Sequence, residues 1–123
     1  MAIEQRVYDM SLDSIAALST HQFKFLMGSG AGVDLCTAAS ENLIGVLQNK
    51  PAASGVACEI RRVGITKIEC GGAITAWDKV TSNALGLGVT AADGERYGGI
   101  ALEAGVTGRL ISMLVEFGYV ETS

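Results

Sequence analysis

From Gln22 onward, apolar and polar residues alternate with a period of two, the pattern of half-buried β-strands. Phe23, Phe25 and Met27 carry the first such run, and Gly28-Ser29-Gly30 ends it. Further strand candidates lie at 42–48, 56–70, 79–82, 99–102 and 109–116. After residue 30 no segment keeps a helical stripe. Short strands separated by Gly-rich turns predict an all-β barrel or clip, with any helix confined to short pieces.

In the longest candidate strand, at 56–70, the alternation of apolar and polar residues is interrupted. Its alternation slips on both sides of Gly64, and Gly71-Gly72 ends it. One extra residue in a strand moves the following side chains to the other face of the sheet, so a slip of this kind marks a β-bulge. We therefore expect one long strand that is bent by bulges.

An offset of 54 residues aligns the two halves of the chain and indicates an internal duplication with a pseudo-two-fold. It places Phe23 on Trp77 and Leu26 on Val80. Other matched pairs are Gly32 with Gly86, Leu35 with Val89, Ala38 with Ala92, Glu41 with Glu95, Gly45 with Gly99 and Val46 with Ile100. The order of strands, Gly turns and Ala-rich turns repeats as well.

Glycine marks a boundary near the N-terminus. Residues 1–27 contain none, and all 16 glycines fall in 28–123. We divide the chain into an N-terminal arm, 1–21, and a β domain, 22–123. The arm is either a short amphipathic helix or an extended segment that orders on a partner. Its apolar residues are too few for a core of their own and too many for a solubilising tail.

Composition narrows the classes of partner. The formal net charge is −4, with nine Lys and Arg against 13 Asp and Glu, so nucleic acid is not expected. No apolar run reaches the roughly 20 residues that span a bilayer, and the N-terminus lacks a secretory pattern. We expect no membrane partner and synthesis in the cytoplasm.

The three cysteines have spacings of 22 and 12, which fit no zinc motif. Reduced, buried thiols are expected.

Catalytic chemistry is scarce. His21 is the one histidine, and no GxSxG, HExxH or P-loop motif occurs. The Gly-Ser-Gly-Ala-Gly run at 28–32 is followed by a strand-like stretch, so we interpret it as a hairpin turn and not a dinucleotide loop. The carboxylates are scattered along turns and edges. We therefore predict no catalytic residue, no cofactor and no metal. Trp77, beside a turn, is expected in the core or in a subunit contact.

Five phrases, in order, resemble the capsid decoration (cement) proteins of tailed phages, of the β-tulip type. They lie at 44–53, 63–68, 71–76, 99–104 and 110–114, and the run 18–25 resembles the first strand of the family. Two features depart from the family pattern. Trp77 stands where the family usually has a small Gly, and the tail after Val115 is longer and more polar than expected.

The resemblance implies a non-enzymatic homotrimer on the outer surface of the virion, made in the host cytoplasm. Such a protein bridges neighbouring major capsid proteins and stabilises the bacteriophage head. It also implies that the N-terminal arm orders against the shell. Arms of this kind gain affinity by acting together. The predicted capsid-contact residues are the apolar side chains of the arm: Ile3, Val7, Tyr8, Met10, Leu12 and Ile15.

Two alternatives come from other functional classes. One is a β-clip module that binds a small molecule or carbohydrate, with Trp77 as a stacking platform. The other is a hydrolase with paired carboxylates, which requires two convergent carboxyl groups in a concave pocket.

Overall fold

The computed structural model describes residues 4–38 and 42–121, and in these ranges every regular element is a β-strand. The strands are β1 Gln5–Asp13, β2 Phe25–Ser29, β3 Gly32–Leu35, β4 Leu43–Leu47, β5 Ala57–Glu69, β6 Lys79–Ser82, β7 Gly88–Thr90, β8 Arg96–Ala101 and β9 Leu110–Tyr119. The prediction of a small all-β, barrel-like fold is confirmed. The described ranges contain no helix long and apolar enough to cross a membrane.

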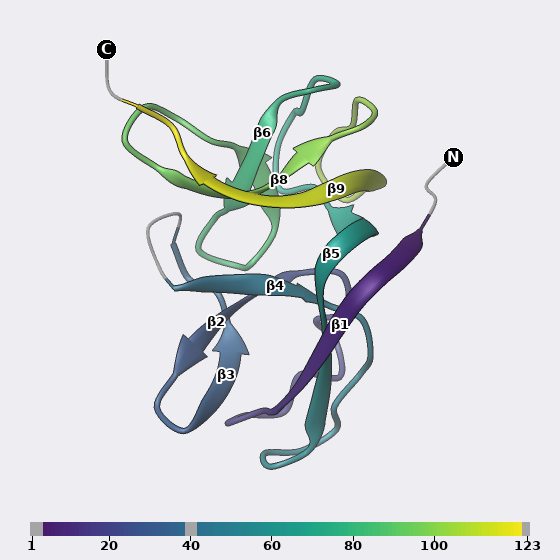
Figure 1. Ribbon diagram of the computed structural model, residues 1–123, viewed down its shortest axis with the longest axis vertical. Helices are drawn as coiled ribbons and strands as arrows, with labels where there is room; N and C mark the ends of the chain where they lie inside the picture. Colours follow the sequence, from purple (N-terminus) through teal and green to yellow (C-terminus); the bar gives the residue numbers. More distant parts are fainter. Residues whose placement is uncertain (1–3, 39–41, 122–123) are drawn as a thin grey trace.

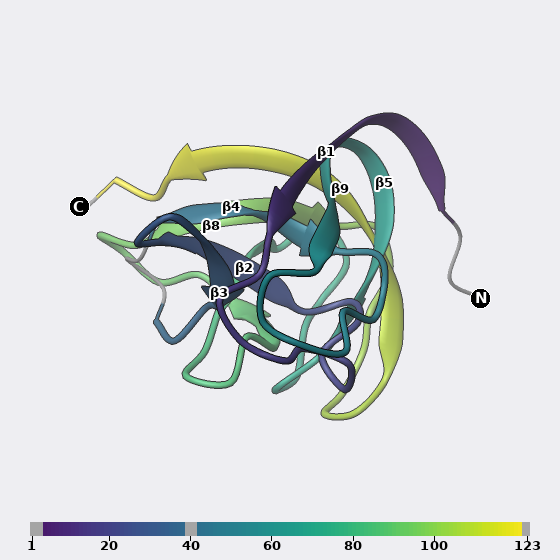
Figure 2. The same ribbon diagram turned by 90° about the horizontal axis from the view of Figure 1, so that it is seen from below.

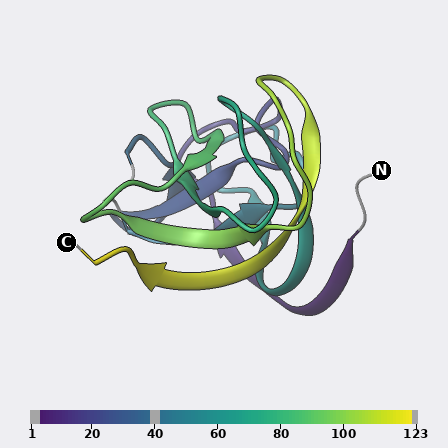
Figure 3. The same ribbon diagram turned by 90° about the horizontal axis from the view of Figure 1, so that it is seen from above.

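All nine strands belong to one open, curled sheet with the order β3-β2-β4-β5-β9-β8-β6-β7, and β1 pairs with β5. The ribbon shows two lobes (Figure 1): β1 to β4 with the first part of β5, and β6 to β9 with the end of β5. In the view from below, β4 of one lobe lies beside β8 of the other (Figure 2). From above, β8 and β9 run side by side towards the C-terminal end (Figure 3).

Strand β5 is the predicted long, bent strand, and it joins the two lobes. Arg61 pairs with β4 on one edge and with β1 on the other, whereas Gly64 pairs with β9 and with β1. The strands β4 and β9 therefore lie one after the other along the same edge of β5. Gly64 has φ +121°, a conformation that favours glycine, and the β1 register shifts at Tyr8 beside it.

The backbone repeats at the offset of 54 that the sequence indicates. The Phe23 N–H donates to Leu47 O at 2.8 Å, and the Trp77 N–H donates to Ala101 O at 2.7 Å. Register repeats too, because the pairs Phe25–Val46 and Lys79–Ile100 differ by the same offset. The strands β2, β3, β4 and β5 thus correspond to β6, β7, β8 and β9.

Strand β1 also has a counterpart in the second repeat. It pairs along the first part of β5, just as residues 64–69 of β5 pair along the first part of β9. The residue directly after each of these two segments forms an isolated parallel β-bridge: Ser14, after β1, pairs with Val33, and Cys70, after β5, pairs with Gly88. The N-terminal segment is therefore extended and paired in this structure, and Leu18 beyond it is buried at 2% exposure.

The buried side chains form two groups, one within the first lobe and one that draws on both lobes. Leu18, Leu26, Val33, Leu47, Cys58 and Ile60 form one cluster. The other contains residues of both repeats, with Phe25 of β2 packed among Ile68, Val80, Ile111 and Met113. Gly98 permits this, because a Cβ there would lie 2.7 Å from Cε1 of Phe25. Phe25 therefore fastens the first repeat into the second.

The turns before β2 and β6 share an unusual backbone. Each is a four-residue turn that a backbone hydrogen bond closes, from the Lys24 N–H to the His21 carbonyl and from the Asp78 N–H to the Thr75 carbonyl. The third residue is Phe23 in the first turn and Trp77 in the second. Their φ angles are +64° and +74°. This left-handed conformation costs an L-residue roughly 1–2 kcal/mol and is ordinarily occupied by glycine.

We expect the free energy of unfolding of Trp77→Gly to exceed that of Trp77→Ala by about 1 kcal/mol, because both variants lack the indole and only glycine removes the strain. Trp77→Ala is the matched control, since alanine keeps the strain, and it should give no such gain. Chemical denaturation of the two variants measures the difference. A Trp77→Gly variant no more stable than Trp77→Ala would contradict the strain.

Candidate interaction surface

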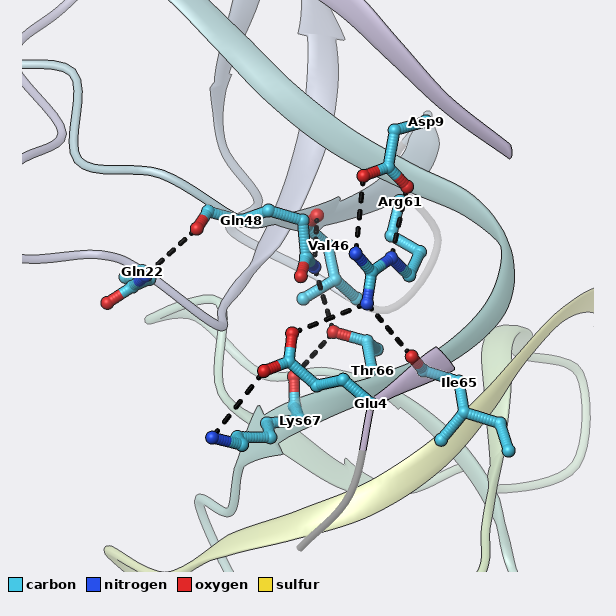
Figure 4. Close-up of polar contacts among 9 residues, drawn as sticks. All are labelled: Glu4, Asp9, Gln22, Val46, Gln48, Arg61, Ile65, Thr66 and Lys67. Carbon is cyan, nitrogen blue, oxygen red and sulfur yellow. Dashed lines mark hydrogen bonds and ion pairs between the residues drawn. The ribbon is translucent and has the colours of Figure 1, made fainter. Parts of the chain in front are cut away.

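The guanidinium of Arg61 lies buried between β1 and β5, at 6% residue exposure (Figure 4). Its Nε donates to Oδ1 of Asp9 at 3.0 Å, and its Nη2 donates to Oδ2 at 3.3 Å. Its Nη1 reaches Oε2 of Glu4 at 3.3 Å and the carbonyl of Ile65 at 3.0 Å. The two-pronged contact with Asp9 matches the planar fork of arginine. Two acidic groups of the N-terminal segment thus neutralise one buried charge of β5.

Further polar contacts lie close to Arg61 (Figure 4). Nε2 of Gln48 donates to Oγ1 of Thr66 at 2.8 Å and to the carbonyl of Val46 at 3.0 Å. Glu4 makes a second ion pair, at 3.5 Å, with Nζ of Lys67. Within the described ranges, no buried side-chain nitrogen or oxygen lacks a hydrogen-bond partner. A fully satisfied network fixes one arrangement of β1 on β5.

Exposed apolar side chains gather along this strand pair. Tyr8 is 55% exposed and is paired with Val63, which is 46% exposed. At the other end of β1, Leu12, Ile15 and Val56 are also exposed, and the Ser14 N–H donates to the carbonyl of Val56. We name these five side chains, Tyr8, Leu12, Ile15, Val56 and Val63, the β1 surface.

The six predicted capsid-contact residues differ in where they lie. Tyr8, Leu12 and Ile15 belong to the β1 surface. Met10 instead packs against the buried cluster of the first lobe. Val7 lies on β1, and Ile3 lies outside the described residues. Sequence reasoning missed Val56 and Val63, because their exposure depends on the bend of β5 and on the pairing with β1.

Trp77 is 71% exposed, so the expectation that it plugs the core is wrong. The subunit contact remains a prediction. The turn that carries it is held firmly: Oδ2 of Asp78 accepts from the Thr75 N–H at 2.9 Å and from Oγ1 of Thr90 at 3.0 Å. A large aromatic side chain is thereby fixed at the surface on a rigid turn.

The remaining reactive side chains lie apart from one another. The described residues contain no group of three or more His, Cys, Asp or Glu that could hold a metal ion. His21 lies 3.4 Å from Nζ of Lys24, and burial together with that charge lowers the pKa of its imidazole. The Gly-rich run at 28–32 forms the β2–β3 hairpin, as predicted.

Cys36, Cys58 and Cys70 are buried free thiols. Burial raises the pKa of Cys58 and of Cys70 above the ordinary thiol value. We expect iodoacetamide at pH 8 to label all three slowly in the folded protein and rapidly in denaturant, as mass spectrometry would show. Rapid labelling of Cys58 or Cys70 in the folded state would contradict this burial.

The Arg61 network predicts a selective loss of stability. Asp9→Ala leaves a buried guanidinium without its two-pronged partner and should lower the free energy of unfolding by about 3 kcal/mol. Asp13→Ala, at the exposed end of the same strand, is the control and should change it little. The double variant Asp9→Ala with Arg61→Met removes the charge as well and should recover part of the loss. Urea denaturation measures all three, and equal losses for Asp9→Ala and Asp13→Ala would contradict the role of Arg61.

No known family model matches this sequence, and no curated protein is recognisably similar to it. Four solved chains match the structure. One of them is the head fiber gp8.5 N base of bacteriophage phi29, with a TM-score of 0.64 and 13% sequence identity. The match covers 89% of this chain and 93% of that chain. At this identity the likeness shows a shared fold.

Proposed function

We propose that this chain is a structural protein of a phage head, and that it decorates the outer capsid surface. The observation that chiefly supports this is the likeness to the head fiber base, because it extends over nearly the whole of both chains. The finer assignment, a β-tulip cement protein that bridges neighbouring major capsid proteins, rests on the sequence resemblance. The role requires no cofactor and no catalytic residue.

The β1 surface is the proposed contact with the major capsid protein. Five exposed apolar side chains lie on the β1–β5 strand pair or directly beside its end, which supports a protein partner. The Arg61 network holds the strand in place before binding, so little ordering cost falls on the encounter. The proposal therefore places the contact of the N-terminal segment on a preformed strand pair.

We further propose that the free protein is a homotrimer, with Trp77 in the subunit contact. Three copies of the β1 surface on one particle would bind together, so a modest affinity at each could give strong retention on the shell. An exposed Trp on a rigid turn suits an anchor at a subunit interface. Sedimentation of the free protein measures the oligomer.

The capsid contact is tested by the triple variant Tyr8→Ser, Leu12→Ser, Ile15→Ser. Each substitution removes apolar surface worth about 1 kcal/mol or more on burial, so binding to undecorated capsids should weaken at least tenfold. Leu85→Ser with Val106→Ser, two exposed apolar residues away from β1, is the control and should bind normally. Co-sedimentation with capsids measures binding, and circular dichroism checks the fold. Undiminished binding of the triple variant would place the contact elsewhere.

A further inference from the structure

A groove of about 580 Å³ opens where the two repeats meet. Leu43 of β4 and Arg62 of β5 line it from the first repeat, and Arg96, Tyr97, Phe117 and Tyr119 line it from β8 and β9. Leu43 and Tyr97 are equivalent positions under the offset of 54, so the groove lies at the seam between the halves. Sites for small molecules favour such interfaces and have volumes of roughly 300–1,000 Å³.

The groove carries positive charge in an acidic protein. Nη1 of Arg62 donates to the carbonyl of Ile44 at 2.7 Å, and its guanidinium lies 4.6 Å from the centre of the Phe117 ring. Among the described residues, neither Arg62 nor Arg96 forms an ion pair with a carboxylate. Nζ of Lys79 lies 5.5 Å from the centre of the Tyr97 ring, although Lys79 does not itself line the groove.

The described residues that line the groove include two arginines and no carboxylate. Oε1 of Glu95 accepts the Ala92 N–H at 2.8 Å and is held in its own turn. The positive side chains therefore face the groove with free hydrogen-bonding capacity on their guanidinium groups.

Gly118 gives the aromatic lining its shape. A Cβ at this position would collide with the ring and hydroxyl of Tyr97, so glycine lets that ring lie close over β9. Tyr119, 56% exposed, adds a second phenol that can donate and accept hydrogen bonds. Flat rings, hydroxyl groups and planar cations thus converge on one groove.

We propose that this groove binds a sugar that carries a carboxylate. Arginine recognises a carboxylate through paired N–H donors, and the stacking of Arg62 on Phe117 sets its plane in advance. The aromatic rings offer apolar faces and the tyrosines offer hydroxyls, which suit a ring with one apolar face and polar edges. An acidic peptide is disfavoured, because the backbones of Arg96, Tyr97 and Tyr119 are already paired in the β8–β9 ladder.

The test is titration calorimetry with a tetrasaccharide of galacturonic acid, with maltotetraose as the neutral probe and tetraglutamate as the peptide probe. The acidic sugar should bind, and its affinity should fall as salt is raised. Arg96→Gln should weaken it about tenfold, the loss of one charge-assisted contact. Arg109→Gln removes the same charge from another exposed site and should have no effect.

Three results would overturn the proposal: no binding of the acidic sugar, equal binding of maltotetraose, or binding that Arg96→Gln leaves unchanged. Binding of tetraglutamate alone would assign the groove to a peptide. If Tyr119→Ser dissolves an oligomer of the free protein, the groove is a contact between copies of the chain. Tyr8→Ser should leave sugar binding intact, and Arg96→Gln should leave capsid binding intact, so a failure here is distinct from a failure of the capsid contact.

Discussion

The arrangement of this protein depends on one buried charge. Arg61 stands in the middle of β5, where the strand passes from one lobe to the other, and its guanidinium is shielded from water. Such a charge is tolerable only when carboxylates and carbonyls surround it. Asp9 and Glu4 supply the carboxylates. The charge therefore ties the N-terminal segment to β5 and gives β1 its register.

A single strand serves both halves of the duplication. The first part of β5 is the last strand of the first repeat. The second part of β5 is the first strand of the second repeat, where it corresponds to β1 of the first repeat. The repeats are thus joined in series, and β1 is the opening strand of the series. Glycine recurs where the halves need close approach or a left-handed turn, as at Gly64 and its equivalent Gly118. Trp77 is an exception, because it has a left-handed backbone conformation at an exposed turn without being glycine.

Two surfaces with different chemistry result from this arrangement. The β1 surface consists of exposed apolar side chains on the β1–β5 pair and beside its end, which suits a protein partner. The groove at the seam combines guanidinium groups with aromatic rings, which suits an anion with an apolar face. The two surfaces share no described residue, so substitutions can alter one surface and leave the other unchanged. Under the proposed function, the chain would attach to the capsid through the first surface and bind a ligand through the second.

Alternation and glycine punctuation by themselves determined the strand class, the bent strand around Gly64 and the hairpin at 28–32, because these depend on local periodicity. Residues matched at an offset of 54 indicated the repeat. The tertiary structure alone decided the rest. Nothing near Arg61 in sequence shows that it would be buried, since its carboxylate partners lie more than fifty residues away. The sequence left Trp77 either in the core or in a subunit contact, and the turn before β6 directs it outward. Pairing between strands that are distant in sequence decides which side chains are buried and which are exposed. The periodicity within one segment does not show that pairing.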